Sequence, residues 1–319
     1  MLKVLSKLSV VELDLTNDCN HNCIWCINRS FREREPVTMD KEFAFDVIKQ
    51  LHEFGVKTLI FSGGGEPLLH PQFSKILLYA KSYKFNIGVI TNGVRIQENY
   101  AMIKDCCDFL IVSIDAGTAE TYKKLHKGEK AEFQKVISSC KQLKSEGFPM
   151  ILFSFLVHPD NYYEVPRLLE FIEIHKINGL LVRPIYLKKM TYNQRFLTEA
   201  KRVHTNVSNT EMSPYINWNM NYFQDLGEMT GEYQHCFFQS GRSVICANGK
   251  MYLCSQVRGV KKFEIGDFNT ESLVNIWAGE RRELVLSRLD ISRCPACRYK
   301  EYNRVMQDIT CNTGRDFLW

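Results

Sequence analysis

Three cysteines lie within eight positions in the stretch TNDCNHNCIWCINR, residues 16–29. Cys19, Cys23 and Cys26 are separated by three and by two residues. Cysteine thiolates hold iron–sulfur clusters, and three ligands on a 4Fe–4S cube leave one iron free to bind another molecule. A structural zinc ion would need a fourth Cys or His at matching spacing, and His21 has the wrong offset. The spacing therefore favours an open 4Fe–4S site over zinc or buried thiols.

A second motif, FSGGGEPLLHP at residues 61–71, joins three glycines to a carboxylate. Gly63, Gly64 and Gly65 permit backbone conformations and close approaches that a side chain would block. Glu66 could pair with an ammonium group. A lone glycine triplet is usually a tight turn, but beside the cysteine loop it indicates a binding edge for a zwitterion.

Short apolar runs alternate with amphipathic helical patterns along the first two-thirds of the chain. The expected strands are residues 10–16, 57–63, 86–92, 109–115, 150–158 and 179–185, and the expected helices are 39–55, 73–84, 132–147 and 163–175. Gly55 and Gly147 stand where a helix would stop. Such alternation implies an α/β fold with a parallel sheet, doubly wound or a barrel, and functional residues in the loops after the strands' carboxyl ends.

Both motifs, in this order and after the first two strands, resemble the radical S-adenosylmethionine (SAM) superfamily, over roughly residues 8–190. The resemblance implies a partial (β/α)6 barrel of the TIM type. It also implies that the unique iron binds the amino and carboxylate groups of SAM, and that reduction releases a 5′-deoxyadenosyl radical that abstracts a hydrogen atom. An electron donor such as flavodoxin or ferredoxin is implied as a partner.

Other strand ends carry candidates for binding the rest of SAM. Trp25 resembles the family's hydrophobic position near the adenine, although core packing is an alternative. Asn92, Ser113 and Asp115 could bond the ribose or methionine moiety, or simply cap turns. Arg183 could meet the methionine carboxylate, with a surface ion pair as the alternative. His158 is the last residue of the fifth expected strand and would face the same open end of the fold, or simply cap a turn.

The C-terminal third carries a second group of cysteines. Cys236, Cys254, Cys294 and Cys297 form two pairs that a small β-hairpin would bring together. They resemble the twitch or SPASM auxiliary domains of the superfamily, as does the stretch 265–285, which looks like the helix between the pairs. A full SPASM domain needs further cysteines, and only Cys311 follows, which favours twitch with one auxiliary 4Fe–4S cluster. Zinc is the alternative for four thiolates.

Two cysteines are left without a ligand role. Cys246 lies on the hairpin and Cys311 near the C-terminus. Each is a plain buried thiol or, if catalytic, a donor that returns a hydrogen atom to the substrate radical. The second reading would make the protein an epimerase.

We therefore expect a radical SAM oxidoreductase or epimerase. It would dehydrogenate or epimerise a carbon bearing O or N in a small polar substrate: a sugar, an aminocyclitol or a nucleotide-like molecule. Maturation of a ribosomally made peptide is the alternative. The first cysteine at residue 19 leaves no room for the leader-binding extension of many peptide-maturing members, which disfavours it. A binding or scaffold protein is disfavoured by the open cluster site.

Composition is compatible with this reading. The chain has 319 residues, 45% of them hydrophobic, and 41 basic against 36 acidic side chains. We expect a core of residues 1–190, a connector of 191–221 and an auxiliary domain of 222–319. No apolar run approaches the roughly 20 residues of a membrane span, and no signal peptide is visible, so we expect a cytoplasmic protein without a membrane or nucleic acid partner. Cys106, Cys107 and Cys140 are expected to be ordinary buried thiols.

Overall fold

A computed structural model describes residues 8–185, 194–211, 213–218, 233–291, 294, 297 and 299–313. Parts of the predicted connector, residues 191–193, 212 and 219–221, lie outside the described residues. The strands are β1 Val10–Asp14, β2 Thr58–Ser62, β3 Asn86–Thr91, β4 Phe109–Ser113, β5 Met150–Val157, β6 Gly179–Pro184, β7 Ile216–Trp218, β8 Arg242–Ile245, β9 Lys250–Tyr252 and β10 Glu264–Asp267. The helices are α1 Arg29–Arg34, α2 Lys41–Phe54, α3 Phe73–Ser82, α4 Tyr100–Cys106, α5 Ala119–His126, α6 Lys130–Ser145, α7 Val165–Ile174, α8 Gln194–Ser208, α10 Leu273–Ala278, α11 Glu280–Ser287 and α12 Lys300–Thr313.

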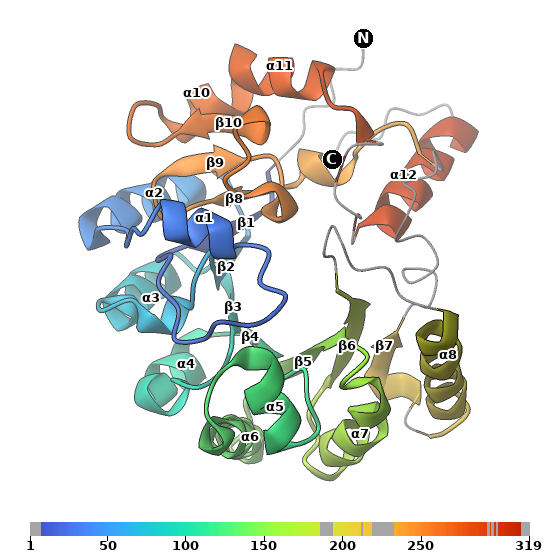
Figure 1. The fold of residues 1–319 in the computed structure, drawn as a ribbon. Coiled ribbons are helices and arrows are strands. Elements are labelled where there is room, and N and C mark those ends of the chain that lie inside the picture. The colour runs from blue at the N-terminus through green and yellow to red at the C-terminus, as the bar shows by residue number, and fades with distance from the viewer. Residues whose placement is uncertain are drawn as a thin grey trace.

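One mixed sheet organises the described chain, in the order β10-β9-β8-β1-β2-β3-β4-β5-β6-β7. Strands β1 to β7 are parallel to their neighbours, as the alternation of strands and helices predicts. Helices α2, α3, α4, α7 and α8 lie along the outer side of the curved sheet (Figure 1). The α/β fold with a parallel-stranded sheet is therefore confirmed, and the sheet is open between β10 and β7.

The strands divide their side chains between two faces with a period of two. Val11 and Leu13 of β1 join the apolar core with the buried faces of the helices, as do Leu59 and Phe61 of β2. The residues between them point to the inner face, where Glu12 lines a cavity. The alternation thus gives each strand a packing face and a polar interior face.

Local signals at the helix ends agree with the sequence. Asp40 precedes α2, and its carboxylate accepts hydrogen bonds from the backbone N–H groups of Glu42 and Phe43 at 2.9 and 3.3 Å. Gly55 follows with a φ of 94°, and Gly147 after α6 has a φ of 85°. Both predicted helix stops are therefore confirmed.

The C-terminal third extends the sheet of the N-terminal part. Strand β8 pairs in parallel with β1, matching Val10 with Arg242, and β9 returns antiparallel to form the expected hairpin. The stretch 265–285, expected to be one helix, instead completes β10 and then forms α10 and α11. The two helices are divided at Gly279, which ends α10 with an extended φ/ψ of −82° and 156°.

A buried ion-pair network fastens the C-terminal part to β1. Arg258 lies 2.7 Å from Asp14 Oδ2 and 2.6 Å from Glu12 Oε2, and it donates to Ser62 Oγ at 2.9 Å. Arg242 Nη2 forms an ion pair with the other carboxylate oxygen of Glu12, Oε1, at 2.6 Å. Only 7% of the Arg258 side chain and 0% of the Asp14 side chain are exposed. Charges at this depth must be paired, so each partner depends on the others.

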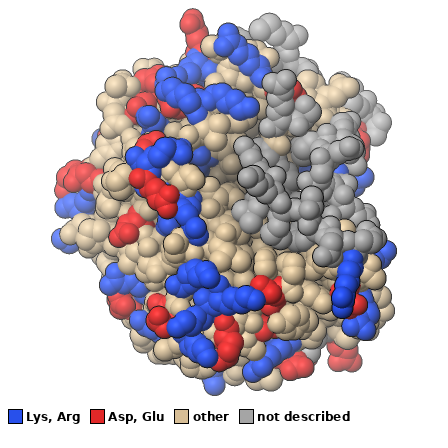
Figure 2. Space-filling model, in the orientation of Figure 1, with Lys and Arg blue, Asp and Glu red and all other residues tan. Residues whose placement is uncertain are grey.

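None of the helices in the described ranges is long and apolar enough to span a bilayer. Basic and acidic side chains are interspersed over the face seen in Figure 2, without a continuous basic surface.

Replacing Arg258 with Met tests the network. We expect Arg258→Met to cost about 3–5 kcal/mol of stability, because it leaves two buried carboxylates without their shared partner. Thermal unfolding would measure the loss. Arg304→Met is the matched control, because the Arg304–Glu301 pair is exposed and such pairs contribute little. Equal thermal midpoints for the two variants would contradict this account.

Candidate active site

A cavity of about 410 Å³ opens at the carboxyl ends of the parallel strands. Both the cysteine loop and the C-terminal part of the chain contribute to its lining. The lining residues discussed below are Cys19, Cys23, Trp25, Cys26, Glu66, Asn92, Ser113, Asp115, His126 and Arg183 from the N-terminal part, and Arg242, Gln256, Arg258 and Tyr299 from the C-terminal part. The cavity therefore lies where the sequence places the chemistry.

Backbone hydrogen bonds hold the cysteine loop on two sides. On one side, Gly65 N–H donates to Thr16 O at 3.0 Å and Glu66 N–H donates to Asp18 O at 2.7 Å. On the other, the N–H groups of Asn22 and Ile24 donate to the last two carbonyls of α5 at 3.2 and 3.0 Å. The loop's course is thus held by backbone hydrogen bonds to two other parts of the chain.

The glycines allow the two loops to touch. A Cβ added to Gly64 would lie 2.1 Å from Asn17 Oδ1, and one added to Gly65 would lie 1.9 Å from Asp18 O. Gly63, Gly64 and Gly65 also line the cavity. Close packing against the cysteine loop therefore requires glycine at 64 and 65, and a contact with a zwitterion stays a prediction.

Glu66 is buried and already bonded within the protein. Its carboxylate accepts from Thr91 Oγ1 at 2.6 Å, from Asn92 N at 2.8 Å and from Leu68 N at 3.1 Å. Burial raises the pKa of this carboxyl, against the effect of these hydrogen bonds. Glu66 thus joins the ends of β2 and β3, and its expected pairing with an ammonium group stays a prediction.

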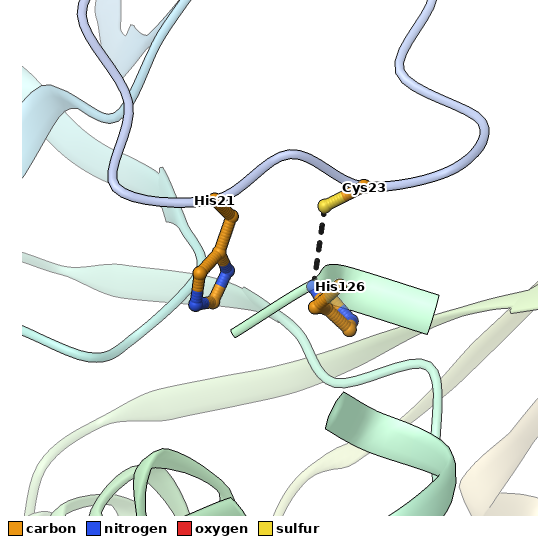
Figure 3. Close-up of side chains that lie close together, drawn as sticks. All are labelled: His21, Cys23 and His126. Atoms are coloured by element: carbon orange, nitrogen blue, oxygen red, sulfur yellow. Dashed lines mark hydrogen bonds between the residues drawn. The ribbon is translucent and has the colours of Figure 1, made fainter. Parts of the chain in front are cut away.

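Two imidazoles, His21 and His126, lie close to Cys23, as Figure 3 shows. His126 Nδ1 lies 3.4 Å from Cys23 Sγ, and the ligating atoms of His21, Cys23 and His126 all lie within 4.8 Å of one another. Burial alone would raise the pKa of Cys23, but the neighbouring His126 and His21 outweigh it and lower that pKa to about 6. Cys19 has no such neighbours, and burial raises its pKa to about 11.

The other predicted cofactor contacts also reach the cavity. Trp25 packs on Leu125 and Ile185 and lies edge-on to His126 at 5.9 Å, so it combines core packing with a position in the cavity wall. Asn92 donates to Asn20 Oδ1 at 2.8 Å. Ser113 and Arg183 line the wall on β4 and β6.

Asp115 is turned inward by an unusual backbone conformation. It has a φ of 49°, and its carboxylate accepts from Leu156 N at 2.5 Å and lies 3.2 Å from His126 Nε2. Its immediate contacts are therefore protein groups, and a contact with SAM stays a prediction. His158, also expected at this mouth, is tilted against Trp25 with ring centroids 6.2 Å apart.

The four C-terminal cysteines come together. Burial raises the pKa of Cys236 to about 12, helped by the nearby thiolates of Cys297, Cys254 and Cys294. Burial likewise raises the pKa of Cys294 to about 11, with Cys297 and Cys254 as the nearest contributors. Four sulfurs drawn from three separate stretches of sequence thus form one group.

The structure does not bring Cys246 to the cavity. Its side chain is 0% exposed and packs with Phe31, Val244 and Tyr252. Burial raises its pKa well above the usual range, with Asp14 as the next contributor. Cys311 lies in α12, but its side chain is outside the described part of the chain. Cys106, Cys107 and Cys140 are buried, as expected.

Several cavity residues were not singled out from the sequence. Glu12, Ser62 and Ser154 are polar residues at alternate positions of apolar strands, and this is the signal that could have revealed them. His126, Arg242 and Arg258 carry no such signal. Their importance depends on contacts with residues more than 100 positions away.

Comparison with known proteins decides the family. A model of the radical SAM superfamily matches residues 13–172, half of the chain. The chain belongs to the radical SAM superfamily. A model of the SPASM iron–sulfur cluster-binding domain matches residues 236–299. Membership implies SAM, a 4Fe–4S radical cluster and auxiliary iron–sulfur binding as the cofactors.

Individual relatives are distant. A probable GTP 3′,8-cyclase of Methanosarcina mazei is 28% identical over 53% of this chain and 52% of its own length, so the match spans about half of that relative. A tungsten-containing aldehyde ferredoxin oxidoreductase cofactor-modifying protein of Pyrococcus furiosus is 22% identical over 86% of this chain and 82% of its own. The structure of Streptococcus suis SuiB bound to precursor peptide SuiA has a TM-score of 0.70 at 14% identity, over 89% of this chain and 67% of SuiB. That likeness concerns the fold alone.

The arrangement of the sulfurs fits clusters better than single ions. Two thiolates on one zinc ion lie about 3.8 Å apart, given tetrahedral geometry and Zn–S bonds of about 2.3 Å. Among the described cysteines, no three sulfurs lie within 4.8 Å of one another. Thiolates that bind separate irons of a cube are spread more widely, so both cysteine groups suit iron–sulfur clusters.

Gly65→Ala tests the contact between the two loops. The new methyl group would meet the Asp18 carbonyl, so we expect the cysteine loop to shift and iron at that loop to fall by more than half. Iron and sulfide assays after anaerobic reconstitution would measure this. Gly241→Ala is the matched control, because a Cβ there has no atom within 4 Å and the φ is −113°. Full iron content in Gly65→Ala would contradict the packing role.

Proposed function

We propose that this radical SAM enzyme uses a 5′-deoxyadenosyl radical to abstract a hydrogen atom from a small polar substrate and dehydrogenates a carbon bearing oxygen or nitrogen. The substrate class is a sugar, an aminocyclitol or a nucleotide-like molecule. The single observation that carries the proposal is the shared cavity. Its lining includes all three cysteines of the N-terminal loop together with Arg242, Gln256, Arg258 and Tyr299 from the domain that carries the second cysteine group.

The radical cluster is held, in this proposal, by Cys19, Cys23 and Cys26. All three line the cavity. The fixed course of the loop favours a preformed three-ligand site, because backbone hydrogen bonds hold it on both sides. The fourth iron would then face the cavity, where SAM can reach it.

SAM would be bound by the strand ends around that iron. We assign the methionine moiety to the edge formed by Gly63, Gly64, Gly65 and Glu66, with Arg183 for its carboxylate. We assign the binding of the adenine and ribose to Trp25, Asn92, Ser113 and Asp115. Their common position in the cavity lining supports this assignment.

The auxiliary cluster is assigned to Cys236, Cys254, Cys294 and Cys297, as one 4Fe–4S cluster. Arg242 and Tyr299 bring the domain of this group to the cavity, because both line it. When bound, the radical cluster with SAM supplies the radical, and the auxiliary cluster supplies an electron acceptor. An electron donor such as flavodoxin or ferredoxin supplies the first reducing electron.

Dehydrogenation is favoured over epimerisation by the position of Cys246. An epimerase of this type needs a thiol that reaches the substrate radical, and Cys246 faces Asp14 and the apolar cluster. The polar lining of the cavity favours a substrate with several hydroxyl or amino groups, because Ser113, Ser154 and Thr91 supply hydroxyls to bind them.

Peptide maturation is the second candidate. The fold is like that of SuiB, which was solved with a precursor peptide. The curated relative from Pyrococcus furiosus is named as a cofactor-modifying protein, which supports a small molecule instead.

Cys23→Ala tests the radical site. We expect cleavage of SAM to fall below one hundredth of the wild-type rate, since two thiolates cannot hold the open cluster, while auxiliary iron remains. Release of 5′-deoxyadenosine under dithionite measures cleavage, and about eight irons should fall to about four. Cys140→Ala, a buried thiol on α6, is the control and should keep both. Undiminished cleavage in Cys23→Ala would refute the assignment.

Cys246→Ala tests the choice of reaction. If Cys246 is only a packing residue, the variant should cleave SAM and turn over substrate at rates within about twofold of wild type. The assay compares 5′-deoxyadenosine with product formed. Normal abstraction combined with loss of product would identify Cys246 as a hydrogen donor and make the enzyme an epimerase.

A further inference from the structure

A histidine that is ion-paired with a carboxylate contacts one cysteine of the proposed radical cluster site. His126 is the last residue of α5, and its Nδ1 lies 3.4 Å from Cys23 Sγ. Its other nitrogen, Nε2, lies 3.2 Å from Asp115 Oδ2, an ion-pair distance without hydrogen-bond geometry. The side chains of His126 and Asp115 are only 1% and 2% exposed. The pair is therefore shielded from water beside the sulfur.

The His126 ring is held in this orientation. Tyr122 stacks on it with ring centroids 4.4 Å apart and an interplanar angle of 18°. Asp115 is itself held, because Leu156 N–H donates to its carboxylate and Asn161 Nδ2 donates to its carbonyl at 2.8 Å. The contact with Cys23 is thus built into the fold and does not depend on a mobile side chain.

A second imidazole, His21, lies near the same cysteine and contacts His126 edge-on, with ring centroids 5.3 Å apart. His21 Nε2 lies 3.0 Å from Glu132 Oε2, while its Nδ1 is buried without a hydrogen-bond partner among the described residues. Two imidazoles, each within 3.2 Å of a carboxylate oxygen, therefore have a ring nitrogen within 4.8 Å of Cys23 Sγ. No comparable group within that distance is formed around Cys19 or Cys26 in the described part of the chain.

We propose that His126, held by the stacked Tyr122 ring and ion-paired through Nε2 with Asp115, carries hydrogen on both ring nitrogens, donates its Nδ1–H to the Cys23 thiolate and thereby raises the reduction potential of the radical cluster. The inference rests on the proposed ligation of that cluster by Cys23. Reduction adds negative charge to the cluster and its sulfurs. A buried donor aimed at one of them stabilises the reduced form more than the oxidised form. His126 is then a positioning and tuning residue, because it acts through Cys23.

The test compares three variants of the anaerobically reconstituted enzyme. His126→Leu removes the donor, and His126→Asn places an amide N–H near the position of Nδ1. His158→Leu is the matched control, because His158 is another imidazole beside the cavity wall and packs against Trp25, with ring centroids 6.2 Å apart. Each protein is titrated with dithionite, and the reduced radical cluster is followed by the EPR signal that changes when SAM is added. Iron and sulfide are measured in parallel.

We expect His126→Leu to keep its iron and sulfide while reduction becomes about tenfold less favourable, a midpoint lower by about 59 mV for one electron. His126→Asn should recover part of this shift, and His158→Leu should match wild type.

Three results would overturn the inference. They are an unchanged midpoint in His126→Leu, equal shifts in the Leu and Asn variants, or loss of about half the iron in His126→Leu, which would make His126 a ligand. Retention of a SAM-responsive cluster in Cys23→Ala would instead refute the proposed function, so the two failures are distinguishable.

Discussion

The backbone hydrogen bonds on either side of the cysteine loop are the constraint on which the site depends. Thr16 and Asp18 bond to the glycine loop, while Asn22 and Ile24 bond to the end of α5. These few bonds fix the loop that carries the three thiols relative to the ends of β2 and α5. They also explain why glycine is required at 64 and 65, where a side chain would separate the two loops.

The alternation of side chains along each strand was the most informative signal in the sequence. All six expected strands and all four expected helices are present, with ends displaced by at most two residues. Periodicity succeeds here because each parallel strand buries one face under helices. The short elements α4, α5 and β7 were not expected, since about two turns of helix, or three residues of strand, are too few for the period of that element to show.

The candidate site was predictable where residues lie close together in the sequence. The cysteine loop and the glycine loop are each one stretch, and both reach the cavity. The partners of those residues were not predictable, because they come from elsewhere in the chain. His126 reaches Cys23 from 103 positions away, and Arg258 reaches Glu12 from 246. Cys246 was a candidate by residue type alone, and packing turns it away from the cavity.

A buried network of ion pairs connects the N-terminal and C-terminal parts of the site. It consists of Arg258, Arg242, Glu12 and Asp14. It fastens the C-terminal domain to β1, next to the loop that carries the first three cysteines. Substrate would therefore be enclosed between two metal groups whose separation is set by charge pairing in the core. In this account, the same residues serve stability and geometry.

The central claim is that two iron–sulfur clusters flank one cavity. The most direct test is a crystal structure of the anaerobically reconstituted enzyme, with anomalous data collected at the iron and zinc absorption edges. The account predicts two iron sites, one bonded to Cys19, Cys23 and Cys26 and one bonded to Cys236, Cys254, Cys294 and Cys297. Zinc at the C-terminal cysteines, or no iron at the N-terminal three, would contradict it.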